Sequence, residues 1–166
     1  MIVDEFDLGP RKKAARDLAK KLIKDIKIKE APVSLQTVIS HLQKEFDLTV
    51  SKIDLSKGIS GLLVRCSELD TEYYAIGFNQ NDPWCRRRFT IAHEIGHLLF
   101  GHTCSKADGS KANNEKEADV FAAELLIPTS LIKKDFARLS NIPDLAKLYR
   151  VSEQAIGIKI CDSRLL

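Results

Sequence analysis

The sequence predicts an α+β fold in which helices flank a small antiparallel sheet of about three strands, with short helices at the C-terminal end. Apolar residues recur at helical spacing before residue 47 and after residue 82. Residues 47–80 instead form short runs rich in β-branched and aromatic residues. A chain of 166 residues is long enough for one domain with a sizeable core, so we treat residues 1–166 as a single domain.

Two helices are expected within residues 1–46. In the segment that begins at Pro10, a good residue for a first helical turn, three apolar residues recur every fourth position: Leu18, Leu22 and Ile26. Ser34 is a suitable N-cap for the second helix. Five apolar residues after it fall on one helical face: Leu35, Val38, Ile39, Leu42 and Phe46.

The sheet is expected in residues 47–80. The segments "LTVSKID", "ISGLLVRC" and "EYYAIGFN" are separated by turn-forming residues at 56–58 and 69–71. From these three segments and the turns between them, we predict an antiparallel sheet of about three strands.

A metal-binding motif lies in the next helix, predicted for residues 83–100. His93 and His97 are four residues apart and therefore share a helical face, with Cβ atoms about 5–6 Å apart, so both imidazoles can reach one ion. Glu94 is rotated by about 100° from His93 and would lie beside the ion, where it can take a proton from water. H-E-x-x-H on a helix is typical of zinc peptidases. The alternative is a buried helix that happens to contain two of the four histidines.

A catalytic zinc usually has three protein ligands, and the sequence offers several candidates for the third. His102 does not match the metzincin spacing, which would need a histidine where Thr103 stands. We therefore interpret His102 as an ordinary loop histidine. Cys104 has suitable chemistry, but nothing in the sequence directs it toward the motif.

The helix predicted within residues 83–127 after the motif is rich in acids. Glu115 and Asp119 are four residues apart, so one could bind the metal while the other orients a histidine. Small residues around them, Ala118, Ala122 and Ala123, would allow this helix to pack closely against the first. For Glu117, the preference of acids for a helix N-terminus is a sufficient explanation.

Residues 128–166 are predicted to be a C-terminal helical segment. Its apolar residues are expected to dock on the domain: Leu145, Leu148, Tyr149, Val151 and Ile156. Four charged residues are expected to be exposed: Lys147, Arg150, Glu153 and Lys159.

Composition excludes several classes of function. The net charge of +3, with basic and acidic residues interleaved, argues against direct nucleic acid binding. No apolar run is long enough to span a membrane, and the N-terminus does not read as a signal peptide. The four cysteines form no C-x-x-C pair, which argues against a zinc site made of thiolates. A disulfide framework is not expected in a chain of this size without an export signal, so we expect a cytoplasmic protein with reduced thiols.

The segment "RRFTIAHEIGHLLFGH" followed by "EKEADVFAAELLIP" resembles the ImmA/IrrE family of HExxH metallopeptidases. That family shows R-F-T-x-A-H-E-x-G-H and then E-x-x-A-[ND]-x-F-A-A-x-L-L-x-P, and the resemblance extends over most of residues 30–160. It implies a zincin-like fold with Zn²⁺ bound by His93, His97 and Glu115, and with Glu94 as the general base. Asp119 falls where the family has Asn or Asp, which fits a residue that orients a ligand.

The resemblance also implies a function. Members of the family cleave, or trigger the loss of, a helix-turn-helix repressor, which relieves repression of a mobile element or a stress response. We therefore expect a zinc-dependent endopeptidase with a protein substrate. Four residues are candidates to stabilise the oxyanion: Tyr73, Tyr74, Arg88 and His102.

The alternative is a zinc-containing regulator without proteolytic activity, which would bind a repressor, an antitoxin-like partner or DNA. The intact Glu94 disfavours this alternative, because a structural zinc site needs no base beside its ligands.

Overall fold

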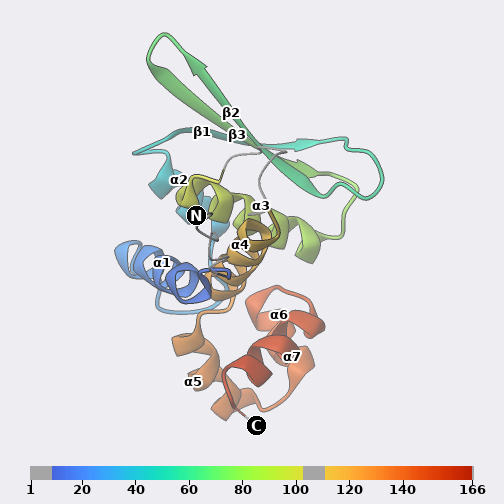
Figure 1. The fold of residues 1–166 in the computed structure, drawn as a ribbon. Coiled ribbons are helices and arrows are strands. Elements are labelled where there is room, and N and C mark those ends of the chain that lie inside the picture. Colours follow the sequence, from blue (N-terminus) through green and yellow to red (C-terminus); the bar gives the residue numbers. More distant parts are fainter. Residues whose placement is uncertain (1–8, 103–110, 166) are drawn as a thin grey trace, which may run out of the picture.

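The structure is a computed structural model that describes residues 9–102 and 111–165 (Figure 1). Within these residues the elements follow in the order α1 (Lys12–Asp25), α2 (Leu35–Leu42), β1 (Asp47–Ile53), β2 (Gly61–Glu68), β3 (Thr71–Asn79), α3 (Trp84–Phe100), α4 (Lys111–Leu126), α5 (Thr129–Leu139), α6 (Ile142–Tyr149) and α7 (Glu153–Asp162). Figure 1 shows the sheet at one end, α3 and α4 in the middle, and α5–α7 at the other end. The α+β fold class predicted from the sequence is confirmed.

The sheet is mixed, with the strand order β1-β3-β2. β2 and β3 form an antiparallel hairpin, whose turn residues Leu69 and Asp70 both have positive φ angles, as a tight hairpin turn requires. β1 pairs with β3 in parallel, so the prediction of an antiparallel sheet is wrong for this pair. The physical reason is that β1 and β2 are not neighbours, because β3 lies between them. The seven-residue connection at 54–60 is long enough to cross over the position of β3, whereas a tight turn would have paired β1 directly with β2.

The N-terminal helices bury the faces that their apolar spacing predicts. On α1, Leu22 is buried while Leu18 and Ile26 are partly buried against the core. On α2, the Ser34 hydroxyl accepts a hydrogen bond from the backbone N–H of Thr37 at 3.3 Å, which confirms the N-cap. α1 packs along α4, one of the two central helices, and α2 lies next to β1 of the sheet.

The C-terminal helices dock as predicted through buried Leu145, Tyr149 and Ile156, but Lys159 is buried rather than exposed. Its Nζ donates to Oε2 of Glu124 on α4 at 2.5 Å. Glu124 also accepts from the backbone N–H and the hydroxyl of Thr129 at the start of α5. A buried ammonium requires such a carboxylate partner, and the pair joins α4 to α5 and α7.

No helix in the described part of the chain is both long and apolar enough to cross a membrane. Among the described residues, Cys66, Cys85 and Cys161 are free cysteines. Cys104, which the sequence offered as a metal ligand, lies outside the described residues.

Candidate metal centre

The centre is formed where α3 and α4 pack side by side (Figure 1). Gly96 on α3 faces Ala118 on α4, and a Cβ atom at Gly96 would lie 3.1 Å from the Ala118 Cα and 3.1 Å from the Phe121 ring. A main-chain atom cannot move aside as the end of a flexible side chain can. The absence of a side chain at Gly96 therefore sets the distance between the two helices that carry the candidate ligands.

We predict that Gly96→Ala destabilises the protein, although alanine normally stabilises a helix. The gain in helix propensity is about 1 kcal/mol, whereas overpacking a core contact costs about 1–3 kcal/mol. Gly157→Ala on α7 is the matched control, because a Cβ there would meet nothing within 4 Å. Urea unfolding of both metal-free variants measures the difference. Equal stabilisation by both substitutions would contradict the packing argument.

Three side chains converge at this junction: His93 and His97 from α3, and Glu115 from α4. The Nε2 atoms of the two histidines are 3.0 Å apart. One oxygen of the Glu115 carboxylate lies 3.3 Å from His93 Nε2, and the other lies 3.3 Å from His97 Nε2. The four-residue spacing on α3 thus has the predicted consequence that both imidazoles face one point.

The dimensions of this triangle fit a tetrahedral cation. Two nitrogens bound about 2.0–2.1 Å from zinc with tetrahedral angles lie about 3.4 Å apart. The observed separations of 3.0 and 3.3 Å are close to that value. Two imidazoles and a carboxylate also form the donor set of zinc peptidase sites that keep a fourth position open.

Asp119 contacts one of the two histidines. Its Oδ1 lies 2.9 Å from Nδ1 of His93, the ring nitrogen that faces away from the cluster. Burial lowers the pKa of His93, but the hydrogen bond to Asp119 and the charges of Asp119, Glu94 and Glu115 outweigh this effect and raise it. Glu115 thus lies against the Nε2 atoms of both histidines, while Asp119, one turn further along α4, contacts Nδ1 of His93.

His102 contacts the other histidine. Its Nδ1 lies 2.9 Å from Nδ1 of His97, and its Nε2 lies 3.0 Å from Oε2 of Glu117. Glu117 in turn accepts hydrogen bonds from Arg11, both from the side chain and from the backbone N–H. These hydrogen bonds from Arg11 lower the pKa of Glu117 to about 2.

Two interpretations made from the sequence are therefore wrong. His102 is not an ordinary loop histidine, because its side chain is only 6% exposed and lies against His97. Glu117 is not explained by a preference for the helix N-terminus, because its side chain is only 3% exposed and paired with Arg11. The signal available in the sequence was the five-residue spacing from His97 to His102, with a glycine, Gly101, just before His102. In the structure Gly101 has a left-handed conformation at the end of α3.

Glu94 lies between α3 and the sheet. It is 8% exposed, and its Oε1 is 3.3 Å from where a Cβ of Gly61 would stand. The same Cβ would lie 2.3 Å from Thr90 Cγ2, so only a glycine lets β2 pass this close to α3. Burial raises the pKa of Glu94 to about 7, although the neighbouring His93 lowers it.

Burial acts in the opposite direction on His97. Together with the charge of His93, it lowers the pKa of His97 to about 4. A neutral imidazole is the form that binds a cation, because it offers a lone pair at one ring nitrogen.

Two of the four candidate oxyanion donors are engaged away from the cluster. Arg88 donates to the backbone carbonyls of Val33 and Arg150. The Tyr74 hydroxyl donates to Glu72 at 2.5 Å on the sheet. Tyr73 lines a shallow hollow on the sheet with Val64 and Cys66, and His102 uses both ring nitrogens in the contacts described above.

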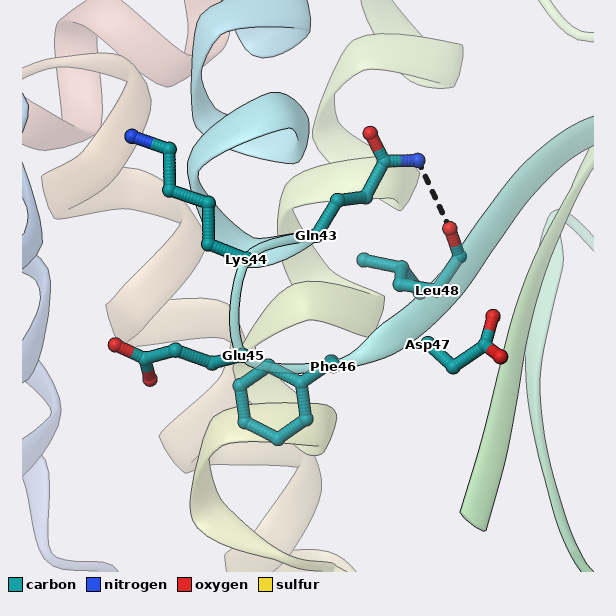
Figure 2. Close-up of a pocket in the computed structure, with 6 residues that line it drawn as sticks. All are labelled: Gln43, Lys44, Glu45, Phe46, Asp47 and Leu48. Atoms are coloured by element: carbon teal, nitrogen blue, oxygen red, sulfur yellow. Dashed lines mark hydrogen bonds between the residues drawn. The ribbon is translucent and has the colours of Figure 1, made fainter. Parts of the chain in front are cut away.

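A separate hollow lies at the turn between α2 and β1, lined by residues 43–48 (Figure 2). The Gln43 amide donates to the Leu48 carbonyl at 2.9 Å, and the Lys44 and Glu45 side chains point away from that bond. None of the cluster residues lines this hollow. It is therefore distinct from the candidate centre.

Comparison with known proteins gives a family and a fold. The family described as IrrE N-terminal-like domain, Peptidase M78, matches residues 43–160, which is more than half of the chain. No curated protein sequence matches significantly. A solved structure of a Mycobacterium tuberculosis transcriptional regulator aligns with a TM-score of 0.65 and 14% identity over 87% of this chain. The chain spans only 45% of the length of that regulator, and the likeness shows the fold alone.

Proposed function

Because the chain belongs to the IrrE N-terminal-like family of M78 peptidases, a metallopeptidase family, we propose that it is a zinc-dependent endopeptidase. In this proposal His93, His97 and Glu115 bind the zinc ion, and Glu94 is the general base. The observation that carries it is the triangle formed by two Nε2 atoms and one carboxylate, 3.0–3.3 Å on a side. Glu94 follows the first of these histidines on the same helix.

A zinc ion bound here would supply Lewis acidity, which lowers the pKa of water and polarises the scissile carbonyl. Glu94 Oε would take a proton from the attacking water as the new C–O bond forms. The same atom would pass that proton to the amide nitrogen as the C–N bond breaks, which balances the hydrolysis. Asp119 would hold the His93 ring in place throughout through its 2.9 Å contact with Nδ1.

The proposed substrate is a helix-turn-helix repressor, and its cleavage would relieve repression of a mobile element or a stress response. Support for this comes from the family resemblance.

The test is incubation of the zinc-loaded protein with a candidate helix-turn-helix repressor, chosen from genes that neighbour its own, with and without a chelator. Cleavage that stops with the chelator and returns with added zinc is the expected result. If the wild type relieves repression without cutting the repressor, the regulator alternative replaces the peptidase. If it does neither, the proposed substrate is wrong.

A further inference from the structure

A continuous set of hydrogen bonds runs from α1 to the candidate metal centre. Arg11, the N-cap residue of α1, donates from its backbone N–H and its Nε to Glu117 Oε1, at 2.8 and 3.0 Å, and from its Nη2 to Glu117 Oε2 at 2.8 Å. Glu117 Oε2 lies 3.0 Å from His102 Nε2. His102 Nδ1 lies 2.9 Å from His97 Nδ1. We call these residues the His97 relay: Arg11, Glu117, His102 and His97.

The donors and acceptors of the His97 relay have only one consistent direction when both histidines are neutral. Glu117 is held by the Arg11 guanidinium as a carboxylate, which can only accept. His102 must therefore carry its proton on Nε2 and accept at Nδ1. His97 must then donate from Nδ1, which leaves the lone pair on Nε2. That Nε2 is the atom that faces His93 and Glu115.

The two histidines of the centre are thus fixed in different ways. His93 contacts the Asp119 carboxylate directly. His97 reaches a carboxylate only through a second imidazole, that of His102. Both arrangements place the proton on Nδ1 and the lone pair on Nε2, which is the tautomer that a shared cation requires.

The ring of His102 is held firmly enough to serve this purpose. Phe100 stacks on it at a centroid distance of 5.2 Å and an interplanar angle of 11°. The Arg11 guanidinium lies 5.1 Å from the centre of the Phe100 ring on the α1 side. The backbone N–H of His102 donates to the His97 carbonyl at 3.0 Å. This hydrogen bond caps the C-terminal end of α3, where Gly101 has a left-handed conformation.

We propose that His102 and Glu117 are positioning residues that select the metal-binding tautomer of His97. The inference rests on the proposed metal site, and it adds a function for two residues that do not themselves contact the cation. It also explains why the Glu117 carboxylate and the His102 imidazole are buried together beside α3. Burying either polar group without a hydrogen-bond partner would cost folding free energy.

The tautomer itself can be observed without any metal. Long-range ¹H–¹⁵N correlation spectra of the ¹⁵N-labelled, metal-free protein above neutral pH distinguish Nδ1–H from Nε2–H for each histidine. We expect His97 as Nδ1–H and His102 as Nε2–H, and we expect His102→Phe to change the His97 signal toward a mixture. Nε2–H on His97 in the wild type would overturn the proposal.

Zinc affinity provides the second test, by competition with a chromogenic chelator. His102→Phe replaces the imidazole with another aromatic ring that can stack on Phe100, but it removes both hydrogen bonds. We expect this variant to bind zinc about 10–100-fold more weakly than the wild type. His102→Gln keeps one acceptor and one donor, and we expect it to restore most of the loss. His41→Phe on α2, away from the centre, is the matched control and should have no effect. Unchanged affinity in His102→Phe, or equal losses in His102→Phe and His102→Gln, would refute the role in selecting the tautomer.

The two tests separate this inference from the proposed function. If the wild type binds no zinc, the proposed function fails, while the spectra of the metal-free protein still decide whether the His97 relay sets the tautomer. If the wild type binds zinc but His97 is Nε2–H in the metal-free state, the His97 relay is refuted and the metal site stands.

Discussion

Glu94→Gln is expected to fold, to bind zinc as the wild type does, and to lose peptide cleavage by about 100-fold or more. The amide has nearly the shape of the carboxyl group but cannot take a proton, and general bases contribute about 10²–10⁴-fold to such rates. Glu94 is buried, and burial raises its pKa to about 7, so a neutral amide suits the same position. The thermal midpoint of the variant should therefore not fall.

The measurement is the rate of repressor cleavage together with the zinc content of each protein. Glu45→Gln, an exposed acid between α2 and β1, is the matched control and should cut at the wild-type rate. A Glu94→Gln protein that retains zinc and cuts as fast as the wild type would exclude Glu94 as the base.

Glu115→Ala is expected to weaken zinc binding by more than about 100-fold, which exceeds the loss typical of residues that only orient a ligand. Its carboxylate forms one corner of the triangle, with oxygens 3.3 Å from both Nε2 atoms. The side chain is 50% exposed, so its removal should leave the metal-free fold intact. Lys116→Ala, an exposed neighbour on α4, is the matched control for helix stability.

Glu117→Ala is not a neutral comparison for this experiment. Its carboxylate is buried and accepts three hydrogen bonds from Arg11, and losing these contacts should cost about 1–3 kcal/mol of folding stability. The metal-free stability of each variant must therefore be measured beside its zinc affinity. A Glu115→Ala protein with unchanged zinc affinity would show that the third ligand lies elsewhere.

The central helices could be predicted because their signals are local. The spacing of His93 and His97 fixes a shared helical face, and the spacing of Glu115 and Asp119 does the same on the next helix. The structure adds the contact between the two faces, which Gly96 and the small residues of α4 allow. Helical periodicity was enough to place these residues on two faces, whereas the choice of Glu115 over Asp119 as the third ligand came from the family resemblance.

The remaining features depend on contacts between distant segments, which periodicity does not encode. The alternation within each strand does not reveal that β3 lies between β1 and β2. Nothing local to Glu117 indicates that Arg11, 106 residues earlier, will pair with it. The burial of Lys159 similarly follows from Glu124 on another helix. In each case the tertiary fold brings together two segments, strands or charged side chains, that are far apart in the sequence.

The most direct test of the metal centre is elemental analysis of the purified wild type and His97→Ala. The Nε2 of His97 lies 3.0 Å from that of His93 and 3.3 Å from the Glu115 carboxylate, so its removal takes away one corner of the triangle. We predict about one zinc ion per chain in the wild type and close to none in His97→Ala. Equal zinc in the two proteins, or no zinc in the wild type after loading, would contradict the account.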